Sequence, residues 1–135
     1  MEECLFCKIR DNKIRSQMVY ENDIVFAFLD IHPVNLGHTL VCPREHYKTI
    51  LDIPEIETGE LIQNIQDISK AVLKATGAKG FNLMVNTNRV SGQLIEHAHF
   101  HIIPRFENDG LRHWPKRDIS KEDMDNIQEK IKKLI

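Results

Sequence analysis

Short apolar runs separated by polar, turn-forming segments dominate much of the chain. Runs rich in β-branched and aromatic residues are typical of β-strands, and the Asn, Asp, Gly and Pro residues between them are typical of turns. We therefore predict strands at residues 19–20, 24–29, 39–42, 81–85 and 97–103. Pro43 and Pro104 mark the ends of the third and the fifth strand.

Two other segments have helical periodicity. Between residues 54 and 76, apolar residues recur one turn apart and form a single stripe: Leu61, Ile65, Ile68 and Val72. Gly77 stands where a helix commonly ends. Ser120, followed by Asp123, indicates the start of a second helix. The apolar positions of this helix are Met124, Ile127, Ile131 and Leu134.

This order of elements predicts an α+β fold, an antiparallel β-meander sheet with one main helix and a C-terminal helix. A chain of 135 residues can bury a core without disulfide bonds. Because no repeat, low-complexity stretch or Pro/Gly-rich linker divides it, we predict a single domain at residues 1–135.

The charges nearly cancel, with 18 basic and 20 acidic residues and a formal net charge of −2. No global field therefore favours nucleic acid or anionic lipid as a partner. The start MEECLFCKIR lacks the basic and apolar regions of a signal peptide, and no stretch approaches the roughly 18–20 apolar residues that span a bilayer. We expect a cytoplasmic protein with no nucleic-acid or membrane partner.

Three cysteines in a reducing compartment do not favour a disulfide framework. Cys4 and Cys7 have the two-residue spacing that suits one tetrahedral metal ion, although a pair of redox thiols has the same spacing. Cys42 stands inside an apolar run and is interpreted as a small core residue.

Three of the seven histidines occur within five residues, at His97, His99 and His101. Side chains alternate along a strand, so the three imidazoles share one face while Ala98 and Phe100 face a core. Residues four apart in a strand lie about 13 Å apart, which prevents the three imidazoles from converging on one metal. Separate roles are predicted; the alternatives are a polar surface face and a metal site that uses two of these histidines with distant ligands.

This segment, His-x-His-x-His followed by Ile102 and Ile103, resembles the signature of the histidine triad (HIT) superfamily. Similarity continues at Asn86, at Gly92 and Gln93, and at Pro104 and Arg105 after the motif. Upstream, segments 26–33 and 37–43 resemble the nucleotide-pocket strands of that family, so the resemblance covers residues 4–105 approximately. The branch it resembles is the zinc-binding, histidine-triad nucleotide-binding proteins of prokaryotic type.

The resemblance implies a nucleotide hydrolase or transferase that attacks the α-phosphate of a purine nucleotide. His99 is then the nucleophile, since a neutral imidazole attacks phosphorus when its other nitrogen is held by a hydrogen bond. The backbone carbonyl of His97 orients it, and His101 contacts the phosphate oxygens, which Gln93 next to Gly92 helps to position.

The remaining nucleotide contacts follow from the same resemblance. Asn86 is expected to bond near the phosphate or leaving group, and Asp30 is expected to accept hydrogen bonds from the ribose hydroxyls. Ile31, Phe26 and Leu29 are candidates to border the base, with core packing as the alternative for Phe26 and Leu29.

Leu94 departs from the pattern of the nucleoside phosphoramidase branch, which has a hydroxyl residue directly after Gly-Gln. Glu96 is a second departure, because an aromatic residue is often seen before the first His of the motif. Loss of a buried hydroxyl donor removes roughly 1–3 kcal/mol of stabilisation at the phosphate or leaving group. The substrate class therefore stays open between a nucleoside phosphoramidate or adenylylated compound and a dinucleoside polyphosphate.

A structural zinc ion and a homodimer are also implied by the resemblance. The ligands would be Cys4, Cys7, His46 and His97, and a metal-free thiol pair is the alternative. Members of the family pair through the main helix and an adjoining strand. His32, His38 and His113 receive no role from the sequence.

A nucleotide-binding partner protein that rarely turns its ligand over is a hypothesis of another class. Release of nucleoside monophosphate separates an enzyme from such a binder. The glycines of the chain form neither a Walker nor a Rossmann pattern, which argues against an ATPase or a dehydrogenase.

Overall fold

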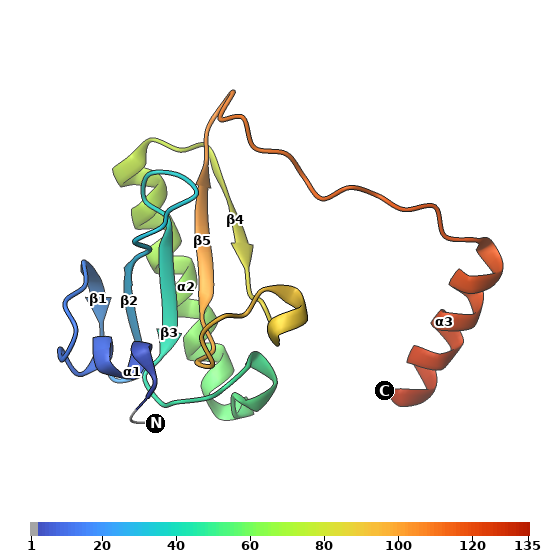
Figure 1. The fold of residues 1–135 in the computed structure, drawn as a ribbon, viewed down its shortest axis with the longest axis horizontal. Coiled ribbons are helices and arrows are strands. Elements are labelled where there is room, and N and C mark those ends of the chain that lie inside the picture. The colour runs from blue at the N-terminus through green and yellow to red at the C-terminus, as the bar shows by residue number, and fades with distance from the viewer. Residues whose placement is uncertain (1–2) are drawn as a thin grey trace.

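The computed structural model describes residues 3–135 (Figure 1). Five strands form one sheet: β1 (Met18–Glu21), β2 (Val25–Leu29), β3 (Thr39–Pro43), β4 (Gly80–Met84) and β5 (Phe100–Arg105). Three α-helices are α1 (Leu5–Arg10), α2 (Glu55–Thr76) and α3 (Lys121–Leu134), and two 3-10 turns are η1 (Ile50–Asp52) and η2 (Arg89–Ser91). The predicted α+β fold is confirmed.

The sheet is antiparallel throughout and has the order β1-β2-β3-β5-β4. The first three strands form the predicted meander. The chain then crosses through α2, which is about 33 Å long and carries it past one strand position to the edge strand β4. From β4 the chain returns as β5 between β3 and β4, so the second half is not a simple meander.

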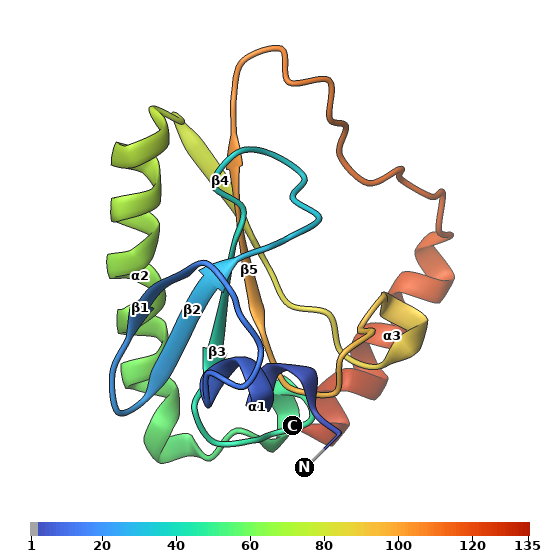
Figure 2. The same cartoon turned by 60° about the vertical axis from the view of Figure 1, so that its left-hand side comes forward.

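The helix α2 covers one face of the sheet (Figure 2). Its apolar stripe Leu61, Ile65, Ile68 and Val72 is buried, as its spacing predicts. On the sheet side, the same cluster contains Val25, Ala27, Val41, Ala98, Phe100 and Ile102. Gly77 ends the helix in the left-handed conformation, at φ +78°. Within residues 3–135, no helix is both long and apolar enough to cross a membrane.

The short helix α1 packs against the opposite face of the sheet (Figure 2). Its residues Phe6 and Ile9 are buried against Phe26 and Phe28 of β2 and against Leu40 and Cys42 of β3. Strand β2 is therefore buried on both faces, which explains its unbroken apolar run. The sequence analysis did not predict α1, because six residues are too few for a clear helical period.

Strand β5 begins at Phe100, three residues later than predicted. Its ladder with β3 starts at the pair Val41 and Phe100. Before that point the chain leaves the sheet, and the backbone N–H of Ala98 donates to the carbonyl of Tyr47 at 2.7 Å. The predicted alternation nevertheless holds, because Ala98 and Phe100 belong to the core under α2.

We expect Gly37→Ala to lower the free energy of unfolding by about 2–4 kcal/mol, measured by chemical denaturation. Gly37 has φ +91°, and an added Cβ would lie 2.6 Å from Cγ2 of Thr76. The control is Gly59→Ala in α2, where no atom lies within 4 Å of an added Cβ. Removing a helical glycine should raise stability by about 0.5–1 kcal/mol. Equal stability of the two variants would contradict the interpretation that the loop between β2 and β3 requires glycine at position 37.

Candidate active site

The ring of His99 is held by its own backbone neighbour. Nδ1 of His99 lies 2.7 Å from the carbonyl oxygen of His97. A carbonyl only accepts, so Nδ1 carries the proton and Nε2 keeps a free lone pair. The ring of Phe6 packs edge-on against His99, with centroids 4.9 Å apart. Burial lowers the pKa of His99 below its ordinary value of 6.5, and Nε2 is therefore unprotonated at neutral pH.

Two further histidines, His38 and His101, lie beside the ring of His99. The backbone N–H of Val34 donates to Nδ1 of His38 at 3.0 Å, so the proton of the neutral ring is on Nε2. That Nε2 lies 2.9 Å from Nδ1 of His101 and donates to it. His101 consequently carries its own proton on Nε2, an atom that is buried and has no hydrogen-bond partner among residues 3–135. Burial lowers the pKa of His101 to about 4, which favours this neutral form.

Asp30 lies beside this chain of hydrogen bonds. Its Oδ2 is 3.6 Å from Nε2 of His38, and its Oδ1 accepts from the N–H of His32 at 2.8 Å. Asp30, His38 and His101 place possible ligand atoms within 4.8 Å of one another. Metal binding through Nε2 of His38 would require the proton on Nδ1, where it would face the N–H of Val34. The hydrogen bonds therefore favour a proton-carrying chain over a metal site.

Four other side chains form a separate cluster, Cys4, Cys7, His46 and His97, whose ligand atoms all lie within 4.8 Å of one another. Nδ1 of His97 is 3.4 Å from Sγ of Cys4 and 3.5 Å from Sγ of Cys7. Nδ1 of His46 is 3.3 Å from Sγ of Cys7. Sulfur and nitrogen ligands of one tetrahedral zinc ion are about 3.6 Å apart, so these spacings fit such an ion.

The orientation of His97 also fits a metal ligand. Its Nε2 donates to the carbonyl oxygen of Pro43 at 2.8 Å, which leaves Nδ1 as a lone pair directed at the two cysteines. Burial lowers the pKa of His97 to about 4. Burial and the neighbouring Cys4 raise the pKa of Cys7 to about 11, so a buried thiolate here needs a positive partner.

Gln93 supports the loops around the site. Its Oε1 accepts from the N–H of Asn88 at 2.8 Å, and its Nε2 donates to the carbonyls of Lys48 at 2.6 Å and Ile95 at 3.0 Å. Both amide hydrogens are used, and the residue is buried. The amide therefore joins two loops, and the role of Gln93 in positioning the phosphate oxygens stays a prediction.

Three other predicted nucleotide contacts lie just after strands: Asp30 and Ile31 follow β2, and Asn86 follows β4. Asp30 lies beside His38, and Ile31 next to it is 78% exposed. Asn86 packs against Gly92, whose added Cβ would lie 3.4 Å from Nδ2 of Asn86. Leu94 is exposed and provides no hydroxyl.

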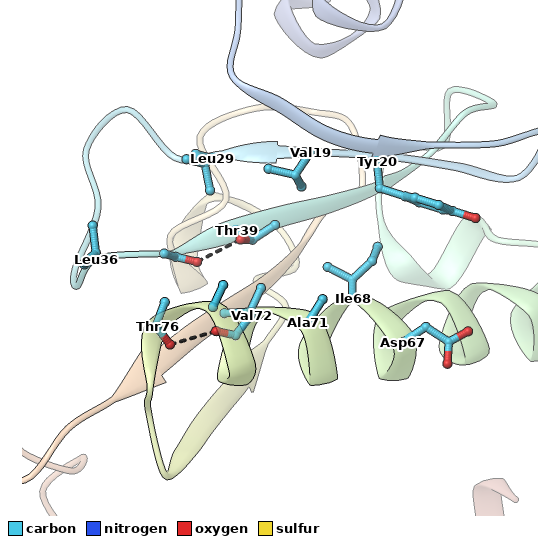
Figure 3. A pocket seen from close by; sticks show the side chains of 12 residues that line it. Val19, Tyr20, Leu29, Leu36, Thr39, Asp67, Ile68, Ala71, Val72 and Thr76 are labelled. Atoms are coloured by element: carbon cyan, nitrogen blue, oxygen red, sulfur yellow. Dashed lines mark hydrogen bonds between the residues drawn. The ribbon is translucent and has the colours of Figure 1, made fainter.

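Phe26 and Leu29 do not border an open site. Phe26 lies on the same face as His97 but is completely buried in the core, so its alternative role in packing fits the structure. Leu29 points to the opposite face, where it lines an apolar cavity of about 570 Å³ between the sheet and α2 (Figure 3). The sheet separates this cavity from His99, which supports the packing alternative for Leu29; a contact of Leu29 with the base stays a prediction.

Two residues of the site escaped the sequence analysis. Phe6 contacts His99, but its position beside the cysteine pair gave no indication of this contact. His38 lies 63 residues from His101 in the chain. Its one signal in the sequence was its place in segment 37–43, which resembles the nucleotide-pocket strands of the HIT superfamily. The strand order β3-β5, which brings His38 beside His101, was not predicted.

Comparison with known proteins gives one family. Residues 11–108 match the HIT domain family. Adenosine 5'-monophosphoramidase hnt1 of Schizosaccharomyces pombe is 37% identical, over 98% of this chain and 98% of its own length. Adenylylsulfatase HINT3 of Arabidopsis thaliana is 40% identical, over 81% of this chain and 55% of its own length. The crystal structure of a HIT-family member from Bacillus subtilis superposes with a TM-score of 0.90, covers 98% of this chain and 97% of its own, and is 34% identical.

The family match covers most of the chain, and the histidine motif stands inside it at His97, His99 and His101. The B. subtilis structure has the same fold over nearly the full length. The resemblance inferred from the sequence is confirmed: the chain belongs to the HIT family.

Proposed function

We propose that this protein hydrolyses purine nucleotide conjugates, with His99 as the nucleophile toward the α-phosphorus. The observation that carries the proposal is the fixed tautomer of His99, with Nδ1–H held by the carbonyl of His97 and a lone pair left on Nε2. An imidazole in this state needs no separate base to attack phosphorus.

The first step forms a bond between Nε2 of His99 and the α-phosphorus and breaks the bond to the leaving group. His101 offers the Nε2–H that can protonate the departing atom, and the hydrogen bond from Nε2–H of His38 to Nδ1 of His101 keeps the proton of His101 on Nε2. In the second step, water attacks the phosphorus of the nucleotidyl-histidine and its proton passes to Nε2 of His101, which restores the proton given to the leaving group. The bond between phosphorus and Nε2 of His99 breaks, which releases nucleoside monophosphate and neutral His99. The carbonyl of His97 stabilises the positive charge that develops on the His99 ring.

Two relatives support a hydrolase of this kind. One is named an adenosine 5'-monophosphoramidase and the other an adenylylsulfatase. Both names describe cleavage of an adenosine 5'-phosphoryl compound, and they differ in the leaving group. A nucleotide hydrolase is therefore supported by relatives as well as by the site.

Leu94 and His101 bear on which leaving group the site accepts. Leu94 gives no hydroxyl to a departing amine, and His101 is the proton donor that the site offers instead. Anhydride leaving groups, such as sulfate or a nucleoside phosphate, have a low pKa and need little protonation. Leu94 therefore favours an adenylylated anhydride or a dinucleoside polyphosphate as a second candidate substrate.

We also propose that Cys4, Cys7, His46 and His97 hold one zinc ion. When bound, this ion supplies a structural cross-link between the N-terminal segment, the segment after β3 and the histidine motif. Four protein ligands leave no open position on the metal for a substrate. We also propose a homodimer of the kind expected for the family, with the exposed apolar residues Phe81 and Leu83 of the edge strand β4 in its interface.

We expect His99→Ala to reduce kcat at least about 10³-fold while changing the affinity for nucleoside monophosphate less than threefold, because a nucleophile acts mainly in the transition state. Release of AMP from adenosine 5'-phosphoramidate and calorimetric AMP binding measure the two effects. The control is His113→Ala, an exposed histidine outside the site. Turnover retained in His99→Ala would falsify the mechanism, and no turnover by wild type would favour the nucleotide-binding hypothesis.

His38→Phe should reduce kcat for adenosine 5'-phosphoramidate about 10²-fold and kcat for adenylyl sulfate less than tenfold, because only the amine depends on proton donation by His101. His38→Gln can place an N–H near Nδ1 of His101 and should recover part of the loss. Steady-state kinetics with both substrates test this. If the two substrates lose activity equally, or Gln restores nothing, His38 does not act through the proton of His101.

Purified protein should contain about one zinc ion per chain, as measured by elemental analysis under conditions that protect thiols. Cys7→Ser should lose the metal and lower the Tm together, because binding free energy of the ion is folding free energy. Cys42→Ala is the control, since Cys42 is a buried cysteine outside the cluster and its variant should keep the metal. A metal-free wild type would leave the thiol pair as the correct interpretation.

A further inference from the structure

The peptide unit between His97 and Ala98 lies outside the sheet, because β5 and its ladder with β3 begin at Phe100. The N–H of Ala98 donates to the carbonyl oxygen of Tyr47 at 2.7 Å. At the other end of the same unit, the carbonyl oxygen of His97 accepts from Nδ1 of His99 at 2.7 Å. One peptide unit therefore connects the ring of His99 with the backbone of Tyr47.

The planarity of this peptide unit couples its two hydrogen bonds. In a planar trans unit the N–H and the C=O point in opposite directions, so a partner that fixes the N–H of Ala98 also fixes the direction of the His97 carbonyl. The two bonds also polarise each other, because the unit donates at one end and accepts at the other. The carbonyl of Tyr47 thus bears on both the orientation and the strength of the bond that holds His99.

The accepting carbonyl belongs to residues 44–49, a segment between β3 and η1 with neither helix nor strand. The segment runs past the start of β5 (Figure 1). Next to it, the carbonyl of Pro43 accepts from Nε2 of His97 at 2.8 Å. Within it, the carbonyl of Lys48 accepts from Nε2 of Gln93 at 2.6 Å. Three backbone carbonyls of this short stretch thus hold the chain before and within the histidine motif.

The side chain of Tyr47 joins this segment to helix α2. Its ring is partly buried and packs against the core cluster under α2. Its hydroxyl donates to Oε2 of Glu57, a partly buried residue in the first turn of that helix. This hydrogen bond and burial raise the pKa of Tyr47 to about 12, so the hydroxyl keeps its proton and remains a donor. The middle of an irregular segment is thereby fixed to a helix of 22 residues.

The ends of the segment have supports of their own. The N–H of Arg44 donates to the carbonyl of Ile24 at 2.8 Å, and Thr49 is the N-cap residue of η1. Between these ends, His46 is directed at the candidate metal cluster and Tyr47 at α2. Since Tyr47 also provides the carbonyl that bonds to the histidine motif, its side chain controls the position of that carbonyl most directly.

We propose that Tyr47, held by Glu57, is a positioning residue for the ring of His99. The bond to the Glu57 carboxylate fixes the carbonyl of Tyr47, and this carbonyl fixes the plane of the peptide unit before Ala98. The plane in turn directs the His97 carbonyl at Nδ1 of His99. Because a small displacement of a nucleophile slows a reaction more than it weakens binding, the pair affects kcat more than KM. This consequence for the rate rests on the proposed function, whereas the effect on the peptide unit does not.

Hydrogen exchange measured by NMR tests the effect on the peptide unit without any substrate. Tyr47→Phe keeps the ring and removes the hydroxyl. We expect exchange of the Ala98 amide to accelerate at least about tenfold more than that of Ile102 within β5, because the opening is local. Tyr20→Phe is the matched control, since Tyr20 lies on β1 and is 46% exposed, and it should leave the ratio of the two rates unchanged. Acceleration of Ala98 no greater than that of Ile102 would overturn the proposal.

Steady-state kinetics with adenosine 5'-phosphoramidate test the consequence for the rate. Tyr47→Phe and Glu57→Leu should each lower kcat about tenfold and change KM less than about threefold. Glu57→Gln keeps an oxygen acceptor and should retain at least about half of kcat. The double variant of Tyr47→Phe and Glu57→Leu should lose no more than either single variant, because both changes break one hydrogen bond.

Two kinetic results would contradict the positioning role of Tyr47. Additive losses in the double variant would mean that the two side chains do not act through one bond. Equal losses in Glu57→Gln and Glu57→Leu would mean that the acceptor oxygen is not what matters. An inactive wild type would contradict only the proposed function, since the exchange of the Ala98 amide is measured without turnover and decides the proposal separately.

Discussion

The position of His97 is the constraint on which the rest of the site depends. Its carbonyl accepts a hydrogen bond from Nδ1–H of His99, and its own ring donates to the carbonyl of Pro43. The remaining nitrogen of His97 faces two cysteines. One buried residue thus connects the two sites, since its ring faces the candidate metal cluster and its backbone carbonyl holds the candidate nucleophile.

Backbone groups decide the protonation pattern of the site. Carbonyls select the tautomers of His97 and His99, and the N–H of Val34 selects that of His38, which in turn selects that of His101. Such partners are in place before any ligand arrives. Burial keeps these rings neutral by lowering the pKa of each. The result is one lone pair and one N–H donor in the same site, the two groups that displacement at phosphorus requires.

The fold provides this arrangement by burying the sheet on both faces. Helix α2 supplies a large apolar layer, and α1 supplies a small one that also brings Phe6 to His99. The order β3-β5 in the sheet places His38 beside His101. A simple meander would place β4 between these strands and separate the two histidines.

The sequence by itself determined features that depend on local periodicity: the strands, the stripe of α2, the caps at Gly77 and Ser120, and the shared face of the three histidines. The family resemblance added the candidate metal ligands, which stay a prediction, and the role of the His97 carbonyl. Tertiary structure alone decided the rest. The pairing of His38 with His101, the amide of Gln93 and the opposite orientation of Leu29 depend on contacts between distant segments, and strand order and loop packing, which no local pattern encodes, create those contacts.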